Sequence, residues 1–249
     1  MRKTFLTLII GVFVFDFSSY PSEAKNNIPQ DGKSNVKITK NPNVKVVQRE
    51  PNKTSTIGNM SQDSSKNSSK IYPIVVFGHP VLHKRCKDIK PGTNVTDLVK
   101  DMFATMYHAD GVGLAAPQIG LDLNIIVIDF YDYVEKGRSK QVEMINPKLF
   151  IDEKSELVAE KEGCLSLPGL RKKVFRKNKI RVKYFDRDWK EHDEEYEGFA
   201  ARIVQHEYDH LLGKLFIDYL DNQQYSSIQQ QLEKIKNKDK DILPSYETL

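Results

Sequence analysis

Two histidines four positions apart, His206 and His210, lie in the segment IVQHEYDHLLG, with Glu207 directly after the first. No proline or glycine interrupts the chain from Phe199 to this point, so we expect a helix. Residues four apart on a helix share a face, so both imidazoles could bind one metal ion. Glu207 is placed where a carboxylate can act as a general base on water. A surface helix with two unrelated histidines is the alternative interpretation.

The class of metal site depends on a third ligand, because catalytic sites keep three protein ligands and one open position. Where metzincin proteases carry a third histidine, this chain has Phe216, which cannot bind a metal. The acidic residues downstream of Leu215 lack the helical setting that thermolysin-like proteases use. Cys164, in the upstream segment EGCLSLPG, is the better candidate, since a thiolate is a strong metal ligand. Its alternatives are an ordinary buried thiol or a disulfide with Cys86.

The segment GVGLAAPQIG places Gly111 and Gly113 on either side of Val112, and small residues then lead to Gln118. Glycine has no β-carbon, so the backbone here can approach another group closely. A phosphate-binding loop is a poor fit, because the segment lacks both G-K-[ST] and a strand–GxGxxG–helix setting. Taken alone, the segment predicts a tight loop that packs on the core.

The elements that must position these residues are short strands and two main helices. Helical spacing of apolar residues predicts a first helix over residues 94–110. The helix that carries the H-E-x-x-H motif comes late, over residues 199–213, and Gly213 is a reasonable residue to end it. This order predicts an α+β fold, with antiparallel or mixed β-sheets packed around the central H-E-x-x-H helix. The expected strands cover residues 123–130, 142–150, 155–164, 180–188 and 192–198.

The positive charge of the chain belongs to its N-terminal part. The 249 residues, long enough for one good-sized domain with additional segments, carry a net charge of +4. Residues 1–70 hold 11 lysines and arginines against 5 acidic residues, a net +6, which leaves 27 against 29 and a net −2 for the remainder. A nearly neutral folded part argues against a direct nucleic-acid site.

The first 20 residues have the form of a signal-peptide core, with two basic residues before a short apolar run that Asp16 interrupts. A short transmembrane anchor is the alternative. Residues 21–65 are rich in lysine, asparagine and serine, which predicts a disordered, transit-like segment. Together they predict a two-part leader into a plastid-type, apicoplast-like organelle, with the mitochondrion as the alternative. We expect a catalytic domain over residues 66–221 and a polar C-terminal helix or tail over residues 222–249.

Taken in order, the segments GVGLAAPQ, EGCLS and QHEYDHL resemble the three signature motifs of the peptide deformylases. The resemblance covers about residues 71–220. It implies a metal-dependent hydrolase that removes the formyl group from the N-terminal formyl-methionine of newly made polypeptides and releases formate. It also implies that one divalent metal ion, Fe²⁺ foremost and Zn²⁺, Ni²⁺ or Co²⁺ as substitutes, is held by Cys164, His206 and His210.

The same resemblance assigns roles to the other motif residues. Glu207 would take a proton from the attacking water and pass it to the leaving amine. The side-chain amide of Gln118 and the backbone N–H of Leu165 would stabilise the oxyanion. The substrate would bind as an added β-strand, with its methionine side chain in an apolar pocket. The residues expected to contact substrate are Gly111, Val112, Gly113, Glu162, Gly163, Arg171, Phe199 and Ile203.

Several alternatives stay open at this point. Phe199 and Ile203 could simply pack in the core, and Arg171 could be a solvated member of the run RKKVFRKNK. Arg202 could face solvent or reach the mouth of the pocket. The expected partners are nascent formyl-methionyl peptides, met free or at the ribosome, and the mature protein is expected to be a monomer or homodimer without a membrane. An H-E-x-x-H protease and an inactive, metal-binding relative are the rival functions.

Overall fold

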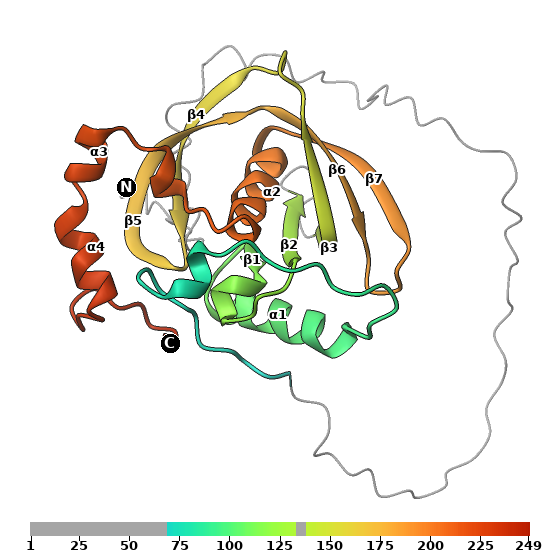
Figure 1. Ribbon diagram of the computed structural model, residues 1–249, viewed down its shortest axis with the longest axis horizontal. Coiled ribbons are helices and arrows are strands. Elements are labelled where there is room, and N and C mark those ends of the chain that lie inside the picture. The colour runs from blue at the N-terminus through green and yellow to red at the C-terminus, as the bar shows by residue number, and fades with distance from the viewer. Residues whose placement is uncertain (1–68, 133–137) are drawn as a thin grey trace, which may run out of the picture. The chain divides into compact units, whose positions relative to one another are not determined.

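The computed structural model describes residues 69–132 and 138–249 (Figure 1). The predicted leader, residues 1–65, lies outside the described residues. Among the helices of the described part, none is long and apolar enough to cross a membrane.

Within the described residues, the strands form two antiparallel sheets. The larger sheet has the order β1-β2-β3-β6-β7, and β4 pairs with β5 in the smaller one. The strands are β1 (Gly113–Ala115), β2 (Ile125–Asp132), β3 (Arg138–Ile151), β4 (Leu157–Cys164), β5 (Leu167–Lys177), β6 (Lys179–Phe185) and β7 (Glu191–Glu197). The helices are α1 (Thr96–His108), α2 (Gly198–Leu211), α3 (Asn222–Ser226) and α4 (Gln229–Lys236), with 3₁₀ turns η3 (Pro80–His83), η4 (Ala116–Ile119) and η5 (Phe216–Tyr219).

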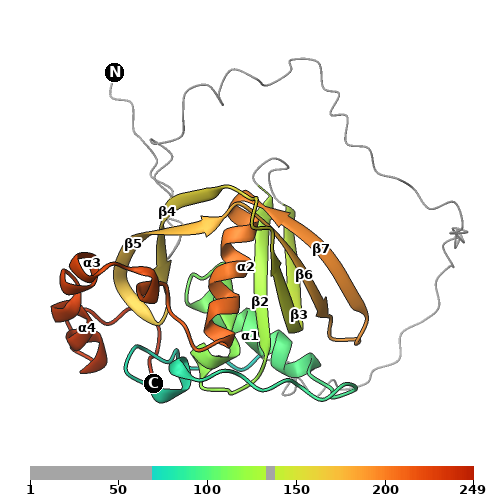
Figure 2. The ribbon, with the colours of Figure 1, turned by 45° about the horizontal axis from the view of Figure 1, so that its top comes forward.

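Helix α2 lies at the centre of this arrangement, as the sequence predicts. It contacts strands of both sheets, and Figure 2 shows it between the β4-β5 pair and the larger sheet. Every residue from Ala201 to Glu207 is buried. A helix buried on all sides can carry polar residues only if they have partners or a chemical task, so its charged residues are candidates for function.

A glycine sets the C-terminal end of α2. Gly213 has a φ of 72°, and a β-carbon there would lie 2.7 Å from the carbonyl carbon of His83 and 2.8 Å from the nitrogen of Lys84. Only glycine combines the left-handed conformation with so close a backbone neighbour. The predicted role of Gly213 is therefore confirmed.

Two strands differ from the sequence prediction. The segment GVGLAAPQIG, expected to be a tight loop, contains β1 and continues into η4, because Gly113, Leu114 and Ala115 pair with β2. The basic run RKKVFRKNK, in which Arg171 could be a solvated member, lies mostly in β5, a strand that the sequence analysis did not predict. Its residues alternate, with Val174 and Arg176 buried and Lys173 and Phe175 exposed. Charged residues are ordinarily expected in solvent. Because Arg176 occupies a buried position, the alternation of buried and exposed residues along β5 is not apparent in the sequence.

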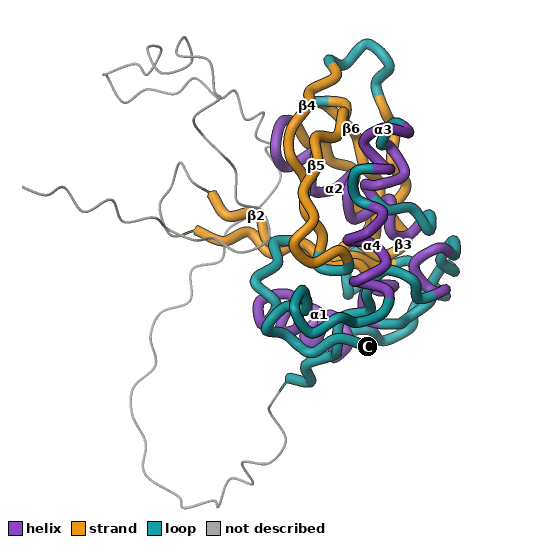
Figure 3. Tube along the Cα trace, turned by 90° about the vertical axis from the view of Figure 1, so that its left-hand side faces the viewer, coloured by secondary structure: helices purple, strands orange, loops and turns teal. Residues whose placement is uncertain are grey.

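The C-terminal residues 222–249, predicted to be a polar helix or tail, pack on the domain. Helices α3 and α4 lie beside β5 (Figure 3), and their apolar residues join a cluster with strand residues. Ile228, Leu232 and Ile235 are buried there with Leu167 and Leu170. The helices are polar overall because a single narrow face is buried.

Candidate active site

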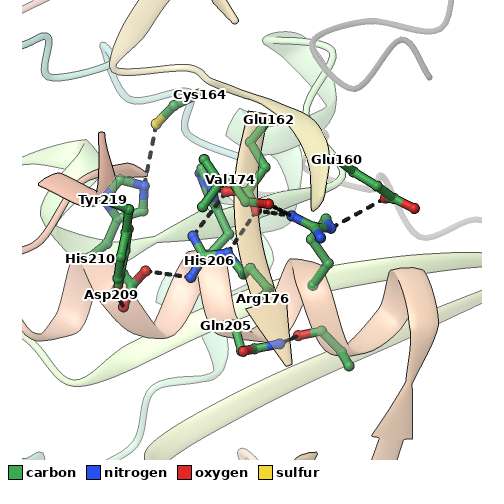
Figure 4. Close-up of polar contacts among 12 residues, drawn as sticks. Glu160, Glu162, Cys164, Val174, Arg176, Gln205, His206, Asp209, His210 and Tyr219 are labelled. Carbon is green, nitrogen blue, oxygen red and sulfur yellow. Dashed lines mark hydrogen bonds and ion pairs between the residues drawn. The ribbon is translucent and has the colours of Figure 1, made fainter. Parts of the chain in front are cut away.

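The end of β4 and the middle of α2 bring together three potential metal ligands. The ligand atoms of Cys164, His206 and His210 all lie within 4.8 Å of one another, and all three residues are buried. Sγ of Cys164 is 3.3 Å from Nε2 of His210 (Figure 4). The two imidazoles meet edge to face, with centroids 5.2 Å apart. The i, i+4 spacing on α2 therefore brings both imidazole rings to the same site, as predicted.

The electrostatics of this cluster favour a bound cation. Burial lowers the pKa of His206, but Cys164 and Glu162 together raise it well above its usual value. Burial, together with His206 and Arg176, lowers the pKa of His210 well below its usual value, so its imidazole is neutral and able to bind a metal. One thiolate and two imidazoles form a donor set that suits a divalent transition metal and leaves a position open. The residues present thus fit one divalent metal ion, as the family resemblance implies.

Glu162 holds the first histidine in place. Its carboxylate is fully buried, and Oε2 lies 2.9 Å from Nδ1 of His206. With Nδ1 engaged in this contact, Nε2 is the ring nitrogen of His206 that could bind a metal. Arg176 donates to both carboxylate oxygens, from Nε at 2.7 Å and Nη2 at 2.9 Å. Burial raises the pKa of Glu162, but the hydrogen bonds from His206 and Arg176 hold it well below its usual range. Only the backbone of Glu162 on β4 remains for the predicted substrate contact.

Arg202 and Asp209 complete this charged network. Arg202 is buried, and its Nη1 donates to Oε1 of Glu162 at 2.6 Å. It also donates to the carbonyls of Val174 and Val158. The solvent-facing position offered for Arg202 is therefore wrong. Asp209 accepts from Nη1 of Arg176 at 2.6 Å. Each charge of this network has an opposite partner, without which its burial would be strongly unfavourable.

Arg176 is a member of this network that the sequence analysis missed. Its place in the basic run RKKVFRKNK suggested a solvated side chain. The available signal was its spacing: Val174 and Arg176 are two positions apart and face the same way on a strand. The acidic partners of Arg176, Glu162 and Asp209, lie 14 and 33 positions away from it in the sequence. Sequence periodicity cannot detect such distant pairs.

Glu207 follows His206 on α2, and one of its carboxylate oxygens is unpaired within the described part of the chain. Its side chain is buried, and Oε2 has no hydrogen-bond partner among the described residues. Burial raises the pKa of the Glu207 carboxyl to about 7. A β-carbon on Gly113 would lie 2.8 Å from both Cγ and Cδ of Glu207. The close approach expected at this glycine is therefore to the carboxylate that could carry a proton near neutral pH.

Gln118 points its amide nitrogen at the cluster. It is buried in η4, and its Oε1 accepts from the N–H of Ala115 at 2.8 Å. This bond fixes the amide so that Nε2 lies 3.5 Å from Sγ of Cys164 and 3.5 Å from Oγ of Ser166. Leu165, next to Cys164, is also buried. The two predicted oxyanion donors thus lie at the cluster, on different elements.

The predicted substrate residues lie around this centre in different settings. In the described part of the chain, β1 pairs only with β2, so it is the edge of the larger sheet. Gly111 and Val112, just before β1, are half-buried, and Gly163 is buried next to Cys164 on β4. Three of the eight residues expected to contact substrate, Val112, Phe199 and Ile203, belong to or pack against one apolar cluster. Arg171 is exposed on β5.

The family model described as polypeptide deformylase matches residues 71–226. The chain belongs to this family. A peptide deformylase of Cytophaga hutchinsonii is 49% identical over 170 residues, which cover 67% of this chain and 88% of that relative. A peptide deformylase of Christiangramia forsetii is 42% identical over 177 residues, covering 67% of this chain and 87% of that relative.

Solved structures agree with the family assignment. The crystal structure of the Thermus thermophilus peptide deformylase has a TM-score of 0.61 and 36% identity, covering 68% of this chain and 99% of that one. An Arabidopsis thaliana peptide deformylase 1B has a TM-score of 0.61 and 37% identity, covering 71% of this chain and 98% of that one. The predicted α+β fold is confirmed by these neighbours and by the sheets and helices described above.

The predicted activity is confirmed at the level of the family. The chain is a deformylase, a metallohydrolase that removes the N-formyl group from nascent peptides. The alternative of an H-E-x-x-H protease is therefore wrong. The alternative of a Cys86–Cys164 disulfide is also wrong, because both cysteines are free.

Proposed function

We propose that the deformylase uses Cys164, His206 and His210 to hold one divalent metal ion and Glu207 to move the proton. When bound, the metal polarises the formyl oxygen and lowers the pKa of water. The observation that carries the proposal is the position of Glu207. A buried carboxyl, with a pKa raised to about 7 and one unpaired oxygen, lies directly after one of the ligands.

Glu207 acts first as a base and then as an acid. It takes a proton from the water that attacks the formyl carbon, and it delivers this proton to the amine nitrogen as the carbon–nitrogen bond breaks. A group with a pKa near the working pH can perform both transfers. Formate and a peptide with a free amino terminus are the products.

Two donors of this chain stabilise the negative oxygen that forms during attack. The Gln118 amide is already fixed by Ala115, so its N–H groups need no reorganisation. The second donor is the backbone N–H of Leu165. Donors held in place before the reaction are worth roughly 3–4 kcal/mol each at comparable sites.

The substrate binds as a strand added to the free edge of β1. The backbone of Gly111, Val112 and Gly113 lines one side, and the backbone of Glu162 and Gly163 lines the other. Such strand addition gives affinity through backbone hydrogen bonds, while a pocket selects the side chain. Phe199 and Ile203, which share an apolar cluster with Val112, form the wall of the methionine pocket. Exposed Arg171 contacts the peptide backbone further along.

We assign Fe²⁺ as the metal, with Zn²⁺, Ni²⁺ or Co²⁺ as substitutes. The test is formate release from formyl-Met-Ala-Ser by protein purified without oxygen, with acetyl-Met-Ala-Ser as the control peptide. Removal of the metal should abolish release, and return of Fe²⁺ or Ni²⁺ should restore it. In air the iron form should lose activity faster than the nickel form, because Fe²⁺ and its thiolate ligand can both be oxidised. Equal decay of the iron and nickel forms, or no formate from folded, metal-loaded protein, would contradict the assignment.

The N-terminal part is a leader for a plastid-type organelle, where the deformylase meets nascent formyl-methionyl chains at the ribosome. Residues 1–20 act as the signal, residues 21–65 as the transit segment, and the catalytic domain follows from residue 66. Support comes from the basic and polar composition before residue 70. A fluorescent reporter fused to residues 1–70 should enter the organelle. A reporter that stays in the cytosol, or enters mitochondria, would contradict this address.

A further inference from the structure

The end of the chain pairs with the first residues of the described domain, at Ile74. Residues 243–249 follow the last helix and lie beyond the part that the family model matches, which ends at residue 226. The backbone N–H of Ile74 donates to the carbonyl of Glu247, and the N–H of Leu249 donates to the carbonyl of Ile74, both at 2.8 Å. These bonds form a parallel bridge between Ile74 and Thr248. The C-terminal segment is therefore held in place.

This segment places one tyrosine against the active-site turn. The hydroxyl of Tyr246 donates to the carbonyl oxygen of Leu165 at 2.7 Å, across 81 positions of sequence. The ring of Tyr246 is partly buried and packs against the cluster that contains Leu165. The contact thus joins the C-terminal segment to the residue whose N–H is the proposed backbone oxyanion donor.

The turn around Leu165 is fixed at its other points by different partners. Cys164 pairs with Leu167 across the turn. The carbonyl of Ser166 accepts from the N–H of Phe77 at 2.9 Å. The carbonyl of Leu165 lies between these points, and Tyr246 is its donor. Loss of the hydroxyl would leave the central peptide group of the turn without that restraint.

We propose that Tyr246 is a positioning residue for the deformylation step. Its hydroxyl holds the carbonyl of Leu165, which belongs to the Leu165–Ser166 peptide group. Through Leu165 it restrains the adjoining Cys164–Leu165 peptide group, whose N–H then points to where the negative oxygen forms. This inference rests on the proposed role of Leu165. A backbone donor stabilises the transition state only if its direction is fixed before the reaction, because a donor that must reorient loses most of its advantage. The C-terminal segment thereby becomes part of the catalytic apparatus.

The substitution Tyr246→Phe tests this directly, since it removes the hydroxyl and keeps the ring. We expect kcat for formyl-Met-Ala-Ser to fall about fivefold to tenfold, with KM within twofold, because orientation is lost only where charge develops. Metal content and melting temperature should match those of the unsubstituted protein. Tyr225→Phe is the matched control, a partly buried tyrosine of α3 that packs against a different cluster, and it should leave kcat unchanged.

A second readout is independent of turnover. The pair Leu165–Ser166 is the one place where serine follows leucine in this chain. Labelling leucine with carbonyl ¹³C and serine with ¹⁵N therefore gives a single NMR cross-peak for this peptide group. We expect the ¹³C resonance to move upfield in Tyr246→Phe, because the carbonyl loses its donor, and to stay in place in Tyr225→Phe.

Three results would overturn the inference. The first is a Tyr246→Phe variant with kcat within twofold of the unsubstituted protein. The second is a rise in KM with an unchanged kcat, which would indicate a role in substrate binding alone. The third is full activity of a Glu207→Gln variant. This result would contradict the proposed function, and the inference that rests on it would fail as well. If Glu207→Gln is inactive and Tyr246→Phe is fully active, only the inference fails.

Discussion

Glutamine in place of Glu207 is expected to lower kcat by about 10³-fold, in the range typical of a lost general acid–base group. Glutamine has almost the same shape but cannot take up or release a proton. The buried carboxyl has a pKa raised to about 7 and an unpaired Oε2, and it follows the potential metal ligand His206 directly in the sequence. The substitution leaves the metal ligands untouched, so metal content should stay at that of the unsubstituted protein. Formate release and metal analysis on the same sample give the measurement.

The control for this prediction is Glu143, a partly buried glutamate whose ion pair is structural. Glu143 forms an ion pair with Arg187, with Oε1 2.6 Å from Nε, and lies on β3. Glu143→Gln should reduce kcat less than twofold, although it loses the ion pair. If Glu207→Gln kept more than a tenth of the activity with metal bound, Glu207 could not be the proton carrier, and another group would have to be sought.

Alanine at Gly113 is expected to lower kcat/KM by about 10²-fold, because a carboxylate displaced by about an ångström loses its catalytic geometry. The new β-carbon would lie 2.8 Å from Cγ and Cδ of Glu207, closer than atoms of this kind approach. The backbone at Gly113 belongs to β1 and is tied to Ile128 of β2, so the side chain of Glu207 must move instead. Overpacking of this kind lowers the free energy of unfolding by about 1–3 kcal/mol. Kinetics and thermal melting, measured with metal bound, check both effects.

A double-mutant cycle separates this cause from a blocked substrate. Glu207→Asp shortens the acid by one methylene and makes room for the new methyl group. In that background, Gly113→Ala should cause a much smaller further loss than it does alone. An undiminished second loss would mean that the methyl group obstructs the peptide strand, and that the contact with Glu207 is incidental.

The sequence by itself determined the chemistry of this protein, because the reacting groups are encoded locally. His206, Glu207 and His210 acquire their relative positions from the geometry of one helix. Their cysteine partner and Gln118 lie in two further short motifs, and the order of the three segments indicated the family. Gly213 marked the end of the helix for an equally local reason, its left-handed backbone.

Tertiary structure alone decided which charges are buried and what holds the site. Arg176 lies in a basic run, and the sequence leaves the position of Arg202 open between solvent and the pocket mouth, yet both bind Glu162 in the interior. Whether a charge can be buried depends on partners from other elements. The periodicity of the sequence does not predict these partners, because they lie far apart along the chain. The contact of Tyr246 with Leu165 has the same character, since it spans 81 positions. The spacing of residues determines which side chains share a face of one helix or strand. Which side chains of different elements contact each other is determined only by the packing of the whole domain.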